Sequence, residues 1–228
     1  MIRNFIFAVL VLCSGKPSLA DGWPVEIANR YGTTRIDAAP TRVVSLSYVG
    51  HDFLLSLGVR PIAVRHWYGD HPHGVWPWAK DALGDARPEV LRGDINVERI
   101  ARLAPDLIVG QWSGMTAADY ALLSRIAPTL APAPGQEDYS SPWQLMLERL
   151  GHATGRADQA DATRDALLAR FARLREEYPD WAGQSAVAVA PAFLSAFTAR
   201  DIRGQLLAAL GLEQPLPLQQ MAGQTQFY

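Results

Sequence analysis

RVVSLSYVGHDFLLSLGVRPIAV, residues 42–64, is the stretch of sequence from which the fold follows. Its first five residues, 42–46, are a short run of mainly β-branched and apolar side chains, which predicts a buried strand. Residues 50–57 predict a helix that ends at Gly58, because glycine suits a helix C-terminus. Residues 61–64 predict a second strand, so the stretch is a strand–helix–strand unit.

A second unit of the same kind begins in LRGDINVERIARLAPDLIVG, residues 91–110. Asn96 can cap a helix, and the apolar positions of that helix fall on one face: Val97, Ile100, Ala101 and Ala104. Residues 107–109 predict a third strand, residues 117–125 a helix and residues 129–131 a fourth strand. Two such units predict a parallel α/β sheet, and ligands bind such sheets at the loops that leave the carboxyl ends of the strands.

The second half of the chain is mainly helical in pattern. Residues 143–150 predict an amphipathic helix that Gly151 and Gly155 interrupt. Residues 157–178 predict a further helix of roughly 20 residues and about 30 Å. A helix of that length is suited to joining two lobes.

The C-terminal part contains few predicted elements. Residues 186–190 read as a strand and residues 201–210 as a helix that ends at Gly211, whereas residues 214–228 have little periodicity. A sheet needs about three strands for independent stability. We therefore expect a second lobe that is incomplete, in a chain that is truncated at its C-terminus.

The first 20 residues have the pattern of a secretory signal peptide. Arg3 precedes the apolar run 5–13, and Ser18-Leu19-Ala20 predicts cleavage after Ala20. A large residue before Cys13 argues against a lipoprotein signal, and the mature chain would have no cysteine and hence no disulfide. After the signal peptide, residues 26–32 predict a small hairpin.

Composition excludes several classes of function. The chain has 49% hydrophobic and 19% charged residues, which is typical of a globular protein. Removal of the signal peptide leaves 19 basic and 23 acidic residues, a net charge of −4 that does not favour nucleic acid or an anionic membrane. Motifs for serine hydrolases, phosphate-binding loops and zinc proteases are absent, so we expect no enzyme.

A long loop is predicted over residues 65–90, and long loops in compact domains are often functional. It contains four potential ligands for zinc or manganese: His66, Asp70, His71 and His73. One interpretation is therefore a periplasmic metal-ion binding protein. The four residues do not have the spacing of a helical metal site, and clustered loop histidines are often incidental.

Five segments together resemble the periplasmic binding proteins that deliver iron–siderophore complexes and cobalamin to ABC importers. These segments are Arg42–Ser47, Leu57–Val64, Asn96–Ile100, Leu103–Val109 and Ile126–Thr129. The resemblance implies two Rossmann-like lobes joined by a long helix, with the ligand between the lobes. It implies a signal peptide at 1–20, an N-terminal ligand-binding lobe at 21–140, linking helices at 141–180 and a partial C-terminal lobe at 181–228.

The function that the resemblance implies is capture of a ferric siderophore or a related iron chelate and its delivery to an ABC permease. Iron would arrive inside its chelator as cargo, so no intrinsic cofactor is expected. The protein would be an exported, periplasmic monomer. The metal-ion interpretation remains as the alternative.

Candidate ligand-binding residues follow the predicted strands: Tyr48, His66, Trp67, Gln111, Trp112 and Ser113. Arg92 joins them because the resemblance places it where the family's N-terminal lobe reaches its ligand, and because a guanidinium can bind two oxygens at once. The alternatives are ordinary loop packing for Tyr48, His66 and Trp67, and packing at the rim of the lobe for Trp112. For Arg92 the alternative is a solvated arginine paired with Asp94.

Glu98 is a candidate of a different kind. In the family that the chain resembles, a surface glutamate at this position of the Asn-x-Glu-Arg motif docks onto arginines of the permease. The alternative is an acidic residue that stabilises the first turn of its helix.

Overall fold

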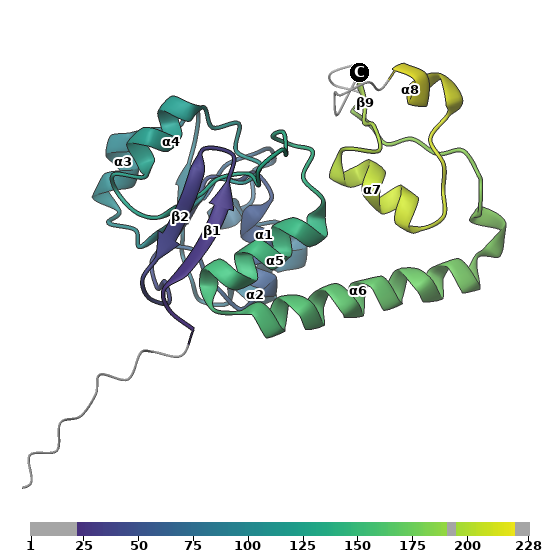
Figure 1. Cartoon of the computed structure of the whole chain (residues 1–228). Helices are drawn as coiled ribbons and strands as arrows, with labels where there is room; N and C mark the ends of the chain where they lie inside the picture. The colour runs from purple at the N-terminus through teal and green to yellow at the C-terminus, as the bar shows by residue number, and fades with distance from the viewer. Residues whose placement is uncertain (1–21, 191–194, 222–228) are drawn as a thin grey trace, which may run out of the picture.

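A computed structural model describes residues 22–190 and 195–221 (Figure 1). The predicted signal peptide, 1–20, lies outside the described residues. The chain forms a sheet body, residues 22–154, and a smaller body, residues 179–221, with one long helix between them. Among the described residues, no helix is both long and apolar enough to cross a membrane.

The sheet body is built on five parallel strands in the order β5-β4-β3-β6-β7. Their bounds are β3 Val43–Ser45, β4 Ala63–Arg65, β5 Glu89–Leu91, β6 Leu107–Val109 and β7 Thr129–Leu130. The chain runs outward from β3 through β4 to β5, then returns to the other side of β3 and continues through β6 to β7. The direction reverses between β3 and β6, and this topological switch point is where open α/β sheets bind ligands.

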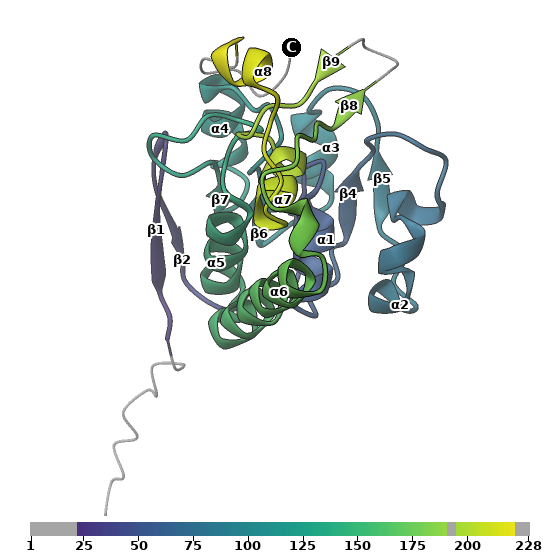
Figure 2. The ribbon, with the colours of Figure 1, turned by 90° about the vertical axis from the view of Figure 1, so that its right-hand side faces the viewer.

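A separate hairpin lies at one edge of the sheet, and β5 lies at the other (Figure 2). The hairpin consists of β1 Val25–Asn29 and β2 Gly32–Ile36, so the predicted hairpin is confirmed and is longer than expected. Thr34 Oγ1 donates a hydrogen bond of 2.6 Å to the carbonyl of Thr129, which ties the hairpin to β7.

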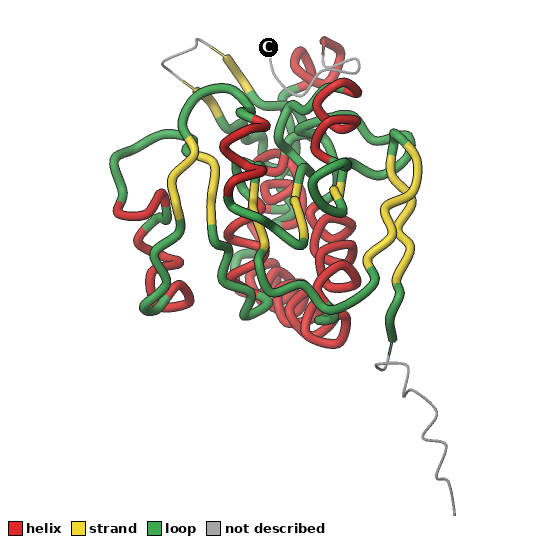
Figure 3. The backbone as a smooth tube through the Cα atoms, turned by 90° about the vertical axis from the view of Figure 1, so that its left-hand side faces the viewer, coloured by secondary structure: helices red, strands yellow, loops and turns green. Residues whose placement is uncertain are grey.

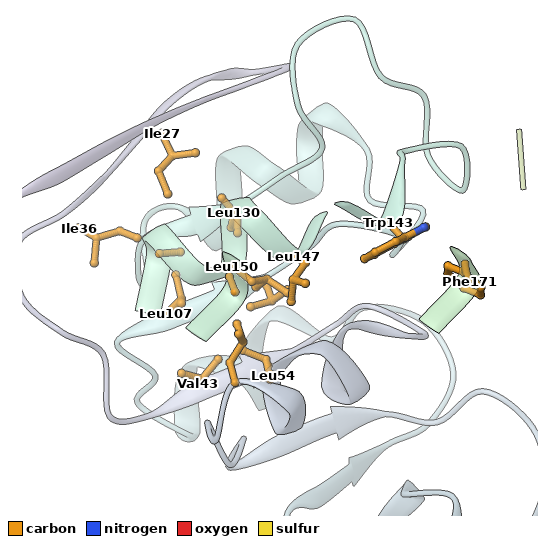
Figure 4. Packing of buried hydrophobic residues seen from close by; sticks show 14 residues of the cluster. Ile27, Ile36, Val43, Leu54, Leu107, Leu130, Trp143, Leu147, Leu150 and Phe171 are labelled. Atoms are coloured by element: carbon orange, nitrogen blue, oxygen red, sulfur yellow. The ribbon is translucent and has the colours of Figure 1, made fainter. Parts of the chain in front are cut away.

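Helices cover both faces of the sheet (Figure 3). Alternate residues of one strand point to opposite faces. Val43 therefore packs with α1 Gly50–Ser56 and α5 Trp143–Thr154, while Val44 packs with α3 Val97–Arg102 and α4 Ala117–Leu123. Figure 4 shows the first of these clusters, in which Leu54, Leu147 and Leu150 meet the strand residues.

The predicted cap of α3 is confirmed. Asn96 Oδ1 accepts a hydrogen bond of 2.8 Å from the backbone N–H of Arg99, which satisfies one of the free N–H groups of the first turn. The helix after Gly50 also agrees with the prediction, and Gly58 follows it with φ of 72°.

The predicted break at Gly151 is wrong, because α5 continues through this residue to Thr154. Gly151 is a contact point between helices: a Cβ there would lie 2.6 Å from the Cβ of Ala160 in α6 Ala157–Glu177. The helix ends at Gly155, which adopts the left-handed conformation with φ of 66°.

The prediction of one unstructured loop over 65–90 is also wrong. The segment contains the edge strand β5, the short helix α2 Lys80–Leu83 and two 3₁₀ turns, Pro72–Gly74 and Pro77–Ala79. Leu83 and neighbouring apolar side chains pack on Leu55 of α1. A strand of three residues and helical segments of three or four are too short to show a hydrophobic period.

The long helix α6 has 21 residues and reaches from the sheet body to the smaller body (Figure 1). After the 3₁₀ turn Pro179–Trp181 come β8 Val189–Ala190, β9 Ser195–Ala196, α7 Ile202–Ala209 and α8 Leu216–Met221. The predicted strand 186–190 is shorter than expected and pairs antiparallel with β9.

The segment after Gln214, whose sequence has little periodicity, forms α8 as far as Met221, and this helix begins directly after Pro215 and tolerates Pro217 in its first turn. Residues 222–228 lie outside the described residues.

Candidate functional site: a cleft between the two bodies

A cleft of about 660 Å³ opens between the carboxyl edge of the sheet and the smaller body. The sheet body lines it with Tyr48, Arg65, His66, Trp67, Gly93, Asp94, Trp112 and Tyr139. The smaller body lines it with Ala190, Ser195, Phe197, Asp201 and Arg203. The volume is within the range of roughly 300–1,000 Å³ that is usual for small-molecule sites.

The floor of the cleft is the topological switch point. The backbone N–H of Tyr48, after β3, donates a hydrogen bond of 3.1 Å to the carbonyl of Trp112, after β6. Leu46 makes the same kind of bond to Val109 at 2.8 Å. The two strands therefore stay paired beyond their formal ends, and this pairing places both aromatic side chains at the cleft.

Two aromatic residues on this floor have left-handed backbone conformations. Trp112 has φ of 59° and Tyr139 has φ of 65°, and their rings pack edge to face with centroids 5.8 Å apart. Such a conformation costs a non-glycine residue about 1–3 kcal/mol, and residues that adopt it cluster at functional sites. Burial raises the pKa of the Tyr139 phenol, so this group is neutral at physiological pH.

Aromatic rings continue from the floor to the mouth of the cleft. The centroid of Tyr48 lies 6.3 Å from that of Tyr139 and 6.2 Å from that of Trp67. Trp67 is 38% exposed and packs edge to face on Tyr68 at 4.5 Å. One wall of the cleft is thus largely aromatic.

Arg65 places a guanidinium in the same wall. Arg65 is the last residue of β4, at the carboxyl end of the strand, and is only 8% exposed. Its Nη1 donates a hydrogen bond of 2.6 Å to the carbonyl of Ser113, and its Nη2 donates one of 3.3 Å to the carbonyl of Gly93. Its Cζ lies 4.5 Å from the ring centroid of Tyr48. Arg65 therefore ties together three of the loops that form the site.

The opposite wall carries a second guanidinium. Asp201 caps α7 and is 1% exposed. Its two oxygens accept hydrogen bonds of 2.7 Å each from Nε and Nη2 of Arg203. The guanidinium lies 3.6 Å over the ring of Phe197 and 5.6 Å over that of Trp67, so Arg203 spans the cleft between the two bodies.

The sequence model of the family described as periplasmic binding protein matches residues 43–226. The chain belongs to this periplasmic binding protein family.

Two named relatives are similar along most of this chain. The probable siderophore-binding lipoprotein YfiY of Bacillus subtilis strain 168 is 29% identical over an alignment that covers 94% of this chain and 67% of that protein. The ferric enterobactin-binding periplasmic protein FepB of Escherichia coli O6:H1 is also 29% identical, over 92% of this chain and 69% of that protein.

The fold is also similar to solved structures. A periplasmic solute binding protein from Mycobacterium smegmatis has a TM-score of 0.77 and 35% identity, over 86% of this chain and 70% of that one. The chain spans about two thirds of the length of these relatives.

Four of the predicted ligand residues line the cleft: Tyr48, His66, Trp67 and Trp112. Gln111 and Ser113 are buried and are not among the lining residues. Ser113 supports the site instead, because its carbonyl accepts the bond from Arg65 and its hydroxyl donates to the carbonyl of Gly110 at 2.6 Å. Roles in ligand contact remain predictions for all of them.

Arg92 does not line this cleft. It lies beside a hollow of only about 10 Å³ near the start of α3, and its Nη2 is 3.6 Å from Oδ1 of the exposed Asp70. The ion-pair partner of Arg92 is therefore Asp70 and not Asp94, which the sequence had suggested. Its role in ligand contact stays a prediction, and the arginines that line the cleft among the described residues are Arg65 and Arg203.

The alternative metal site is not assembled. Among the described residues, no three His, Cys, Asp or Glu side chains lie close enough to hold a metal ion. His66 Nε2 lies 3.1 Å from the carbonyl of Gly69, and the ring of His71 packs on Trp76 at 4.2 Å.

Sequence reasoning missed several cleft residues: Arg65, Gly93, Asp94, Tyr139, Phe197, Asp201 and Arg203. Arg65 had a usable signal, since it ends a predicted strand at the ligand-binding edge of the sheet. Tyr139 follows the last strand of the sheet at the same edge. Arg203 had no such signal, because its place depends on how α7 is carried by α6.

Proposed function

We propose that this chain binds a ferric siderophore, or a related iron chelate, in the cleft and delivers it to an ABC permease. The observation that carries the proposal is the cleft itself, with aromatic walls and a guanidinium on each side, in a member of the periplasmic binding protein family. Two relatives are named for siderophore or ferric enterobactin binding.

The chemistry of the cleft suits such a ligand. Siderophore complexes are bulky and present oxygen atoms around an apolar framework. The rings of Tyr48, Trp67 and Phe197 offer apolar surface, and the two guanidinium groups favour oxygen acceptors. Iron would stay inside its chelator, so the protein would need no metal ligands and no catalytic group.

The remaining parts of the proposal concern delivery. Glu98 is exposed in the first turn of α3 and is free to meet a partner protein, which fits its predicted role in docking on the permease. We further propose export through the segment 1–20, a periplasmic location and a monomeric state. The zinc or manganese alternative has less support, because its four side chains do not converge.

Tryptophan fluorescence tests this function, because Trp67 and Trp112 lie at the cleft. A panel of ferric siderophores and cobalamin is titrated into the mature protein, with zinc and manganese ions as the test of the alternative. We expect saturable quenching by at least one ferric chelate and none by the free ions. An unchanged signal with every chelate, or tight binding of zinc alone, would contradict the proposal.

A matched pair of variants locates the binding. Trp67→Ala removes a ring that lines the cleft, and Trp78→Ala removes a ring from the same segment that is 68% exposed and does not line it. We expect about a tenfold loss of affinity for Trp67→Ala and little change for Trp78→Ala. Equal losses of affinity in the two variants would mean that the ligand binds outside the cleft.

A further inference from the structure

The charges that line the cleft balance one another. Among the described residues, the charged side chains there are two arginines, Arg65 and Arg203, and two aspartates, Asp94 and Asp201. A site built for a multiply charged anion would be expected to carry an excess of positive charge. Over the described arginines and aspartates that line this cleft, two positive and two negative charges cancel, so they supply no such excess.

Arg203 is already engaged by a carboxylate. Both oxygens of Asp201 accept from its guanidinium at 2.7 Å, which uses one edge of the planar fork. Because Asp201 is buried, this pair cannot separate without leaving a carboxylate unpaired in a site of low polarity. The charge of Arg203 is therefore largely compensated before a ligand arrives.

Arg65 is held in place by the protein as well. Two of its N–H groups donate to the carbonyls of Ser113 and Gly93, and its face covers Tyr48. Asp94, directly after Gly93, is exposed on the same wall, and no ion pair joins it to another described residue. An anion that approaches Arg65 therefore also meets the carboxylate of Asp94.

On the proposed function, we infer that the cleft selects an uncharged ferric tris-hydroxamate over a trianionic ferric tris-catecholate. Three hydroxamates, each with a single negative charge, neutralise a ferric ion, whereas three doubly charged catecholates leave a trianion. The neutral complex can give up its water to the aromatic walls at small cost. The trianion would lose more hydration, would gain only the positive charge of Arg65, and would lie near the carboxylates of Asp94 and Asp201.

The test compares the affinities of a neutral ferric tris-hydroxamate and a trianionic ferric tris-catecholate by calorimetric titration of the mature protein. We expect the neutral chelate to bind at least about tenfold more tightly at low ionic strength. The difference should shrink as salt is added, because salt screens the repulsion of the trianion.

Variants separate charge from shape. Asp94→Asn and Asp201→Asn each remove one negative charge from the cleft, and asparagine at position 201 can still cap α7. Asp85→Asn is the control: it removes one charge from an exposed loop before β5, at the amino ends of the strands and so on the side of the sheet away from the cleft. We expect Asp94→Asn and Asp201→Asn each to reduce the ratio of the two affinities several-fold, and Asp85→Asn to leave this ratio unchanged.

Each outcome is decisive. A trianion that binds as tightly as the neutral chelate overturns the inference but leaves the proposed function standing. If the neutral chelate is preferred but neither the variants nor salt change that preference, the selection is due to shape and the inference from charge is wrong. Absence of binding by both chelates and by every other ferric siderophore tested contradicts the proposed function and this inference with it.

Discussion

The backbone N–H of Tyr48 donates a hydrogen bond to the carbonyl of Trp112 at 3.1 Å, and this bond joins the two loops between which the sheet reverses direction. The residues are 64 positions apart in sequence and come from different strand–helix–strand units. Their pairing brings the two aromatic side chains to one cleft floor. The site therefore depends on backbone geometry that small substitutions can test.

Gly114 is the first such position, because a Cβ there would lie 2.4 Å from the hydroxyl of Tyr139. Gly114→Ala should displace the Tyr139 ring and weaken binding of a ferric chelate about tenfold. It should also lower the free energy of unfolding by about 1–2 kcal/mol, because φ is +70° at this residue. Fluorescence titration and urea unfolding measure the two effects.

Gly135→Ala is the control for Gly114→Ala, since Gly135 has φ of +72° and no neighbour within 4 Å of its would-be Cβ. It should cost similar stability and leave affinity unchanged. Combining Gly114→Ala with Tyr139→Phe removes the clashing hydroxyl and should restore part of the lost affinity. Equal losses of affinity in the two alanine variants would disprove the role given to Tyr139.

Gly151 tests the contact between α5 and α6. Alanine is a better helix former than glycine by about 1 kcal/mol, yet Gly151→Ala should destabilise the protein by about 1–3 kcal/mol through overpacking. The reason is the 2.6 Å approach of its Cβ to that of Ala160. Urea unfolding should show a lower midpoint for Gly151→Ala and recovery when Ala160→Gly is added; a rise in the midpoint of the single variant would refute this packing.

His51 predicts a dependence of stability on pH. Burial lowers the pKa of its imidazole, and the nearby Asp52 carboxylate offsets only part of this effect. In the unfolded chain a histidine titrates at about 6.5, so below that pH the unfolded state binds a proton that the folded state resists. The free energy of unfolding should therefore fall as pH decreases from about 6.5 toward the folded-state pKa.

Urea unfolding between pH 7.5 and pH 5 measures this effect of His51. His51→Gln cannot take up the proton, so its stability should decrease less over the same interval. An identical decrease in the variant and the natural sequence would mean that other groups cause the dependence.

Arg65→Lys tests the guanidinium that ties the cleft loops together. Lysine keeps the charge but lacks the two separate nitrogens with which the planar guanidinium donates to the carbonyls of Ser113 and Gly93. We expect about a tenfold loss of affinity for a ferric chelate. Arg87→Lys is the matched control, because Arg87 also donates to two backbone carbonyls but is exposed and does not line the cleft.

Much of the sheet body was predictable because its elements are local. The strands at Val43 and Leu107 are β-branched or apolar on both faces, and Asn96 marks the start of a helix. The edge strand at Glu89 was missed because only pairing with β4 makes it a strand. Gly151 was misread because its small size serves contact with another helix and does not break its own.

The candidate site was predictable only where it follows a strand. Tyr48, Trp67 and Trp112 could be located from the rule that ligands meet the carboxyl ends of parallel strands. Arg92 was chosen by motif position, whereas Arg203 reaches the cleft because α6 carries the smaller body against the sheet body. That placement is a tertiary property with no signature in the sequence near residue 203.

The most direct test of the central claim is a calorimetric titration of ferric siderophores into the mature protein and into the double variant Tyr48→Ala/Trp67→Ala. The account predicts one chelate bound per chain and a weakening of about a hundredfold in the double variant, because both rings line the cleft. Absence of binding by every ferric siderophore, or the same affinity in the double variant, would contradict it.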